Sequence, residues 1–187
     1  VTPLVTTWGH EVLSQTDAPW QEYPRPQLVR DGWISLNGFW EFAVTSNESK
    51  EFPVAWQGEI RVPFPLESKL SGVQILLEPG SALWYHRNFT ISSLPRGYRL
   101  LLNFEAVDYH CTVYVNGVTI GNHTGGFTPF SMDITDTLTV GSNAIIVRVE
   151  DETNSNGQVV GKQRVRPRSI FYTRASGIWQ SVWLEWV

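Results

Sequence analysis

Cys111-Thr112-Val113-Tyr114-Val115, followed by Asn116-Gly117 and then Val118-Thr119-Ile120, is the stretch that decides the fold class. Apolar and polar residues alternate on both sides of the Asn-Gly pair, which is typical of β-strands with one buried face. Because Asn-Gly tolerates the positive φ angles of a two-residue turn, this stretch predicts a β-hairpin. The same pattern occurs around Asn37-Gly38, between residues 33–36 and 39–44, and predicts a second hairpin.

Further strands are expected where short alternating segments, rich in Val, Ile, Phe, Tyr and Trp, are bounded by turn residues. These segments are 84–91, 99–104, 144–150 and 180–186. No stretch of a dozen residues has a helical apolar stripe. The sequence therefore predicts an all-β chain of about eight strands that closes as a two-sheet antiparallel jelly-roll β-sandwich.

The sandwich is expected over residues 28–187, and residues 1–27 are expected to form an extended N-terminal arm. The arm contains Pro3, Pro19, Pro24 and Pro26. Proline removes a backbone donor and favours extended chain, so we expect the arm to wrap over the sandwich or over a neighbouring domain. A polar, turn-rich segment from Asp151 onward predicts a long loop reaching roughly to residue 169.

Composition limits the function classes. The chain has 187 residues, of which 42% are hydrophobic and 17% are charged, and this is ordinary for one domain with a substantial core. The net charge of −4 offers no basic surface for nucleic acid or for an anionic membrane. No run approaches the roughly 20 apolar residues of a membrane span. Neither nucleic acid nor a membrane is therefore expected as a partner.

Cysteine and asparagine positions add two expectations. The single cysteine, Cys111, is in phase with Val113, so we expect a buried, inert thiol and no internal disulfide. Asn-x-Ser/Thr sequons begin at Asn47, Asn88 and Asn122. These sequons favour, without deciding, a secreted or periplasmic location.

A set of motifs then follows one another along most of the chain. They are 22–30, 33–40, 62–68, 83–87, 104–108, 113–117, 125–130 and 176–184. In this order they resemble the N-terminal sugar-binding domain, a galactose-binding-like jelly roll, of glycoside hydrolase family 2. That family includes β-galactosidases, β-glucuronidases and β-mannosidases.

The resemblance implies that the catalytic residues lie in other domains of a larger enzyme. Enzymes of the family join such a jelly roll to an immunoglobulin-like domain and to a TIM barrel that holds two catalytic glutamates. A barrel of about 250 residues does not fit in this chain. The chain alone is therefore expected to be inactive, while its parent would be a retaining β-glycosidase acting on a β-linked carbohydrate.

The same resemblance gives the candidate substrate-binding residues Asp108, Tyr109 and Arg174. Asp108 lies where β-galactosidases of the family carry a sugar-binding Asn, and a carboxylate would also accept sugar hydroxyls. The alternative is that Asp108 caps a turn through its own backbone. Residues 171–174 replace a segment in which β-galactosidases supply an Asp, so galactose specificity does not follow. Arg174 would reach substrate, pair across a domain interface, or form an exposed salt bridge, the plainest alternative.

Candidates for chemistry within the chain itself are weak. Glu150 and Glu152 would lie about 6–7 Å apart on one strand face, a spacing that is generic for strand ends. The four histidines show no metal-binding spacing, so no catalytic residue, metal or cofactor is assigned. Two rival hypotheses stay open. One is a free-standing lectin-like carbohydrate-binding module with a structural calcium near 150–152, and the other is a pure interaction domain.

Aromatic residues have two expected uses. Residues 125–130 are expected to form a structural turn in which Phe127 and Phe130 pin the loop to the core, with sugar stacking on Phe127 as the alternative. Strand patterns place three tryptophans in the core, at positions 33, 40 and 183. The tryptophans at positions 8, 20 and 56 lie in expected loops and would face a ligand or a partner domain.

Overall fold

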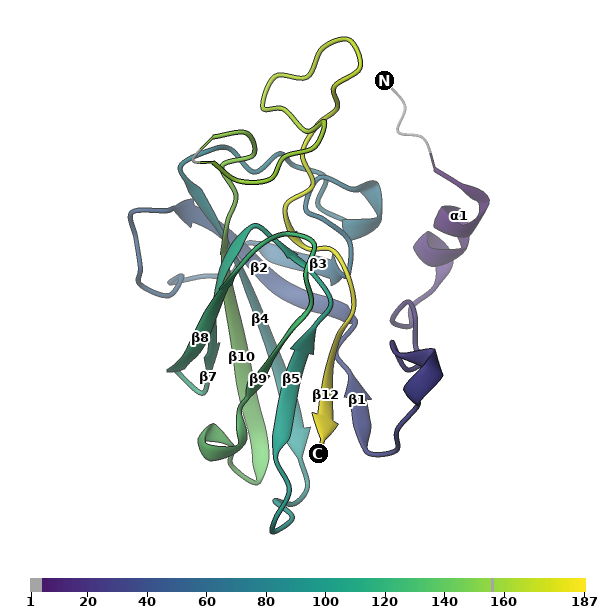
Figure 1. Cartoon of the computed structure of the whole chain (residues 1–187), viewed down its shortest axis with the longest axis vertical. Coiled ribbons are helices and arrows are strands. Elements are labelled where there is room, and N and C mark those ends of the chain that lie inside the picture. The colour runs from purple at the N-terminus through teal and green to yellow at the C-terminus, as the bar shows by residue number, and fades with distance from the viewer. Residues whose placement is uncertain (1–4, 156) are drawn as a thin grey trace.

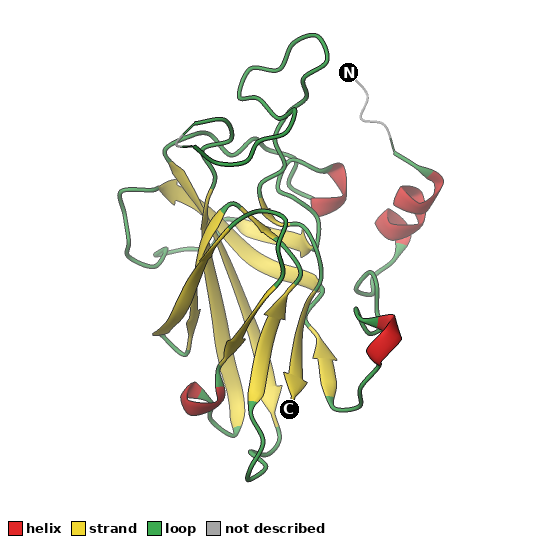
Figure 2. Ribbon diagram, in the orientation of Figure 1, coloured by secondary structure: helices red, strands yellow, loops and turns green. Residues whose placement is uncertain are grey.

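The computed structural model describes residues 5–155 and 157–187, and it shows a two-layer antiparallel β-sandwich (Figures 1 and 2). One sheet has the strand order β1-β12-β5-β9 and the other has the order β3-β2-β4-β10-β7-β8. The strands of the smaller sheet are β1 (Trp33–Ser35), β5 (Leu100–Phe104), β9 (Phe130–Asp133) and β12 (Val182–Trp186). Those of the larger sheet are β2 (Gly38–Ser46), β3 (Gly58–Val62), β4 (Ser81–Ile91), β7 (His110–Val115), β8 (Val118–Thr124) and β10 (Gly141–Glu150). The predicted all-β jelly-roll sandwich is confirmed.

Two short strands, β6 (Val107–Asp108) and β11 (Gly177–Ile178), pair with each other in a separate ladder. Short 3₁₀ turns occur at Pro26–Leu28, Lys69–Ser71 and Thr135–Thr137. The peptide bonds Val62–Pro63 and Asp108–Tyr109 are cis. No helix among the described residues has the length and apolarity needed to cross a membrane.

The hairpin predicted at Asn116-Gly117 is confirmed. β7 pairs with β8 with Val115 opposite Val118, so the turn holds two residues. Asn116 and Gly117 have φ angles of +51° and +79°, the left-handed values that this turn requires. Cys111 is fully buried on the same strand face as Val113, as expected from their phase.

The hairpin predicted at Asn37-Gly38 is wrong, because the chain crosses there from one sheet to the other. β1 pairs with β12, whereas β2 pairs with β3 and β4. Asn37 is buried, its Oδ1 accepts a hydrogen bond from the Val182 amide at 3.0 Å, and its Nδ2 donates to the Pro19 carbonyl at 3.2 Å. Asn37 therefore supplies a buried side chain that fixes the crossover, and Gly38 supplies a positive φ angle.

The N-terminal arm differs from the extended chain predicted over 1–27. Residues 1–4 lie outside the described residues, and Thr7–Ser14 form helix α1. The Thr6 side chain caps this helix by accepting a hydrogen bond from the Gly9 amide at 3.0 Å. The prediction of extended chain is wrong for 7–14 because the prolines flank this segment and leave it free to coil. The arm does lie against the sandwich, since Arg61 donates to the carbonyls of Val12 and Gln15.

The core lies between the sheets and is built from both of them. Leu83, Val147, Leu102 and Leu184 are all fully buried in one apolar cluster. Trp40 and Trp183 are buried as expected, while Trp33 is only half-buried. Burial of large apolar side chains is worth about 1.5–3 kcal/mol each, so this cluster fixes the two layers and the loops at their ends.

Candidate functional site

The candidate site centres on Asp108, at the end of the sandwich where β6 pairs with β11. The register sets Asp108 opposite Gly177. Asp108 is only 3% exposed, and its Oδ1 atom has no hydrogen-bond partner among the described residues. A buried carboxylate oxygen without a donor is costly, so this atom is a candidate for binding a donor from outside the chain.

Gly126 closes one side of the Asp108 carboxyl group. A Cβ at position 126 would lie 2.4 Å from Asp108 Oδ1, so only glycine fits here without a shift. The turn 125–130 thus has a function that its sequence did not reveal. It brings a backbone surface directly against the carboxyl group and so keeps water away from it.

Two further acids, Glu67 and Asp151, surround the same centre and are held by Ser176. The Ser176 hydroxyl donates to Asp151 Oδ2 at 2.6 Å, and the Ser176 amide donates to Glu67 Oε2 at 2.8 Å. Burial raises the pKa of Glu67, and hydrogen bonds from Ser176 and from the Leu77 amide oppose that rise. The centre therefore gathers three carboxyl groups from distant segments.

The electrostatics of this centre favour a protonated Asp108. Burial is the largest cause, the nearby charges of Asp151 and Glu67 add to it, and together they raise the pKa of Asp108 to about 7. A hydrogen bond from Gln163 opposes the rise. At neutral pH the carboxyl group therefore exists in both protonation states, and it is able either to donate or to accept a hydrogen bond.

Tyr109 lies next to this centre and faces a different cavity. Its side chain is half-buried and lines a cavity of about 300 Å³ together with His110, Glu150 and Gln158. The Tyr109 carbonyl accepts a hydrogen bond from the Gly125 amide at 3.0 Å, so Tyr109 also anchors the turn that closes over Asp108.

Arg174 is buried, whereas its plainest expected role was an exposed salt bridge. Its side chain is fully buried, and its Nη2 pairs with the exposed Glu78 at 2.8 Å. Its Nε donates to the Leu77 carbonyl at 2.6 Å, and its Nη1 donates to the Val165 carbonyl at 3.4 Å. The guanidinium group thus ties the long loop after β10 to the segment that precedes β4, and it faces protein groups.

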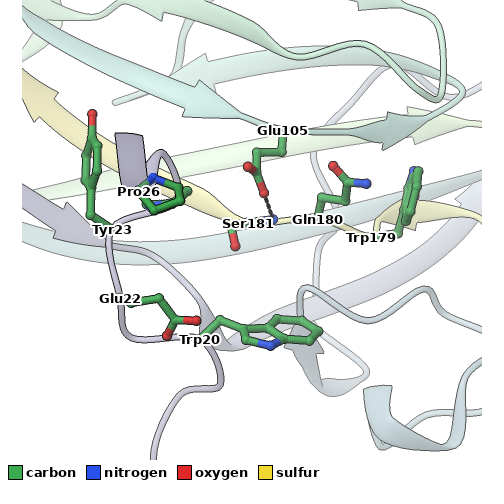
Figure 3. A pocket seen from close by; sticks show the side chains of 9 residues that line it. Trp20, Glu22, Tyr23, Pro26, Glu105, Trp179, Gln180 and Ser181 are labelled. Atoms are coloured by element: carbon green, nitrogen blue, oxygen red, sulfur yellow. Dashed lines mark hydrogen bonds between the residues drawn. The ribbon is translucent and has the colours of Figure 1, made fainter. Parts of the chain in front are cut away.

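A second feature is an aromatic cleft of about 680 Å³ between the N-terminal arm and the start of β12. Figure 3 shows the side chains that line it, with Glu105 and Gln180 on one wall and Trp20 on the other. Trp20 is 51% exposed. Trp179, which also lines the cleft, donates from Nε1 to the Gly126 carbonyl at 2.8 Å. The cleft and the Asp108 centre are therefore connected through the turn at Gly126.

The loop 125–130 is only partly pinned as predicted. Phe130 is half-buried and stacks on Phe104, whereas Phe127 is 57% exposed and touches Trp179 edge to face. The prediction that Phe127 packs into the core is wrong. The backbone of Gly126 turns into the site instead and leaves the neighbouring ring outside.

The acids at 150–152 are engaged with protein groups. Glu150 pairs with Arg148 at 2.7 Å and with Lys50 at 3.0 Å, and Glu152 accepts a hydrogen bond from the Gly80 amide. Burial alone would raise the pKa of Glu150, but the hydrogen bonds and charges of Arg148 and Lys50 lower it. Among the described residues no group of three or more His, Cys, Asp or Glu is arranged to hold a metal ion. The possibility of calcium near 150–152 thus stays a prediction without a matching donor set.

Sequence reasoning did not connect Glu67, Gly126, Asp151 or Gln163 with Asp108. Glu67 and Gly126 lie inside motifs that carried the resemblance, and this was the available signal. Their contacts with the Asp108 centre depend on four separate segments meeting in space, which no local pattern specifies.

Comparisons with known proteins agree with this architecture. Residues 66–178 match the family described as the glycosyl hydrolase 2 galactose-binding domain-like family. A β-galactosidase from Thermoanaerobacter pseudethanolicus is 29% identical over 102 residues, which are 54% of this chain and 13% of that protein. A β-glucuronidase from Paenibacillus borealis is 28% identical over 138 residues, which are 71% of this chain and 23% of that protein.

A solved structure gives the same picture of the fold. The crystal structure of a Ruminococcus gnavus β-glucuronidase aligns with a TM-score of 0.68 at 23% identity, over 89% of this chain and 30% of that chain. At this identity the likeness concerns the fold alone. The chain spans less than a quarter of the length of the two curated relatives and under a third of this structure.

Proposed function

The chain belongs to the glycosyl hydrolase 2 galactose-binding domain-like family, and from this premise we propose that it is a non-catalytic domain that supports a β-glycosidase and contributes to its sugar pocket. In this proposal Asp108 binds a sugar hydroxyl and Tyr109 lies at the rim of the pocket. Arg174 holds the loops in place without touching the substrate.

The observation that carries the proposal is the unpartnered Oδ1 of Asp108. Folding has buried this oxygen without giving it a donor, and a sugar hydroxyl is a donor of the right size and polarity. The closing turn at Gly126 would have to shift for the hydroxyl to enter. Its neighbour Phe127 is exposed, so this ring does not hold the turn to the core.

The aromatic cleft supports the proposed link to further domains. Trp20, Glu22 and Trp179 border an open space of about 680 Å³ between the arm and the sandwich. Trp8 on helix α1 is 74% exposed as well. An exposed tryptophan beside an open cleft, with a second exposed tryptophan on the same arm, is typical of a surface that another domain covers. We assign this face to the immunoglobulin-like and barrel domains of the parent enzyme.

The acids of this chain do not support chemistry within it. A retaining glycosidase needs one carboxyl group with a raised pKa and a second that is free to attack, about 5–5.5 Å away. Glu150 has a lowered pKa and two cationic partners, so it is suited to neither role. Asp108 has a raised pKa, but it is shielded by Gly126 and lies in the interior.

The proposal is tested in the full-length parent enzyme. Asp108→Ala should lower kcat/KM for a β-glycoside by roughly 10- to 100-fold, because a hydrogen bond to a charged or polarised carboxyl group is worth about 1.5–3 kcal/mol. Asp136→Ala is the matched control, since this acid is exposed and lies in the 3₁₀ turn before β10. Equal kcat/KM values for both variants would rule out a role for Asp108 in binding substrate.

The 187-residue chain by itself separates the remaining alternatives. With the same β-glycoside it should show no turnover, and calorimetry with free monosaccharides should show no measurable heat of binding. Turnover would overturn the non-catalytic assignment. Tight binding of a free sugar would favour the free-standing lectin-like module instead.

A further inference from the structure

The long loop between β10 and β11 contains an unusual concentration of positive charge. Residues 153–184 hold Lys162, Arg164, Arg166, Arg168 and Arg174 but no Asp or Glu. The other nine Lys and Arg share the rest of the chain with all 18 acidic residues. The chain is therefore acidic overall, with one strongly basic segment.

This basic segment, residues 162–172, is held in a defined shape at its base. The Tyr172 amide donates to the Lys162 carbonyl at 3.1 Å, and the Arg164 amide donates to the Tyr172 carbonyl at 3.0 Å. Arg164 lies over the Phe171 ring, with its guanidinium carbon 4.2 Å from the ring centroid. Because Pro167 fixes the φ angle between Arg166 and Arg168, the backbone between these two cations is also restricted.

The tip of the segment projects away from the sandwich at the end that carries the long loops (Figure 1). Lys162, Arg166 and Arg168 are exposed, and none of them forms an ion pair with the described residues. Arg174 behaves differently, because it is buried and paired with Glu78. The three exposed cations are thus free to bind an external anion.

The base of the segment adjoins the Asp108 centre. The Gln163 side chain accepts a hydrogen bond from the Ala175 amide at 2.7 Å, and Ala175 directly precedes Ser176, which holds Asp151 and Glu67. Gln163 also lies near enough to Asp108 to oppose the rise in the pKa of its carboxyl group. The basic segment and the Asp108 centre are therefore neighbours through Gln163.

We infer that residues 162–172 form a binding site for acidic carbohydrate, in which Lys162, Arg166 and Arg168 contact carboxylate or sulfate groups. The planar guanidinium groups of the two arginines match both anions through paired hydrogen bonds. Tyr172 is 57% exposed on the same segment and offers a ring face for sugar stacking. The choice of carbohydrate rests on the proposed function, whereas the preference for an anion rests on the charge alone.

The test is affinity electrophoresis of the 187-residue chain in gels that contain polygalacturonate, a sulfated galactan or a neutral galactan. Salt is kept below about 50 mM, where the Debye length exceeds 10 Å. Both acidic polymers should retard the chain and the neutral polymer should not. Retardation by only one of them would assign the site to uronate or to sulfate.

Three double variants make the test specific. Arg166→Gln/Arg168→Gln should weaken binding about tenfold or more, since it removes two charge-assisted contacts. Lys69→Gln/Arg96→Gln removes the same charge from exposed positions elsewhere and should bind like the wild type. Arg166→Lys/Arg168→Lys, which keeps the charge but loses the planar fork, should fall between them.

Several results would overturn the inference. The first is no retardation of the wild type by either acidic polymer. The second is an equal loss of affinity in Arg166→Gln/Arg168→Gln and in Lys69→Gln/Arg96→Gln. The third is equal retardation by a single-stranded RNA of similar charge density. The parent enzyme's activity does not enter this assay, so the inference and the proposed function fail separately.

Discussion

Replacing Asp108 with Asn should stabilise the chain at pH 8 relative to the wild type, and the gain should shrink as the pH falls. Burial and neighbouring acids raise the pKa of Asp108 from an ordinary value of 3.8 to about 7. A folded-state pKa above the unfolded value means that the folded chain binds the proton more tightly. The stabilisation from this proton is complete below about pH 4 and is lost as the pH rises through about 7.

The expected magnitude follows from the size of the shift. About three pKa units correspond to roughly 4 kcal/mol between pH 3 and pH 8, and to about 3 kcal/mol between pH 5 and pH 8. Asn is neutral at every pH, so Asp108→Asn lacks this dependence. The difference in unfolding free energy between the wild type and the variant should therefore change by about 3 kcal/mol across pH 5–8.

Urea unfolding followed by tryptophan fluorescence at pH 5, 6, 7 and 8 measures this difference. Asp136→Asn, at an exposed position, serves as the control and should track the wild type at every pH. A wild-type minus Asp108→Asn difference that stays constant within about 0.5 kcal/mol would refute the reasoning, because it would mean that water reaches the carboxyl group in the folded chain.

Three further predictions concern the packing around the site. Gly126→Ala should destabilise the chain by about 1–3 kcal/mol in urea unfolding, because its Cβ would lie 2.4 Å from Asp108 Oδ1, whereas Gly121→Ala, with its nearest contact at 3.5 Å, should cost less. Cys111 should react with a thiol reagent only on unfolding, since burial raises the pKa of its thiol to about 12; fast labelling of the native chain would contradict this. Arg174→Gln should speed tryptic cleavage after Arg168, because the loop loses its hydrogen bond to Leu77 and its ion pair with Glu78; an unchanged cleavage rate in a time course would show that other contacts hold the loop.

The strand positions were predictable because they depend on alternation, which is local. The expected strands at 84–91, 99–104, 144–150 and 180–186 all lie within or overlap observed strands. The two Asn-Gly pairs show the limit of local reasoning. Both tolerate a tight turn, but at Asn37 the side chain is buried against Val182, and that long-range contact directs the chain into the other sheet.

The composition of the site was harder to predict for the same reason. The resemblance pointed to Asp108, which lies at the centre of the cluster, and to Arg174, which is buried and hydrogen-bonded to the Leu77 carbonyl. The acids that perturb Asp108 come from positions 67 and 151. Their proximity is created by the pairing of β6 with β11, a ladder of two residues per strand that has no sequence pattern of its own.

The same oxygen atom connects the stability of the fold with its proposed role. An ionised Asp108 is unfavourable in the closed site because it is buried beside Asp151 and Glu67 and its Oδ1 has no donor, and the closed site therefore favours the protonated form. A hydroxyl that donates to Oδ1 would favour the ionised form instead, so a ligand would recover part of the free energy lost on burial. Asp108→Asn removes that charge, and with it both the cost of burying it and the hydrogen bond that it would form with a ligand. The variant should therefore gain stability at pH 8 and lose a charged hydrogen-bond acceptor for a sugar hydroxyl.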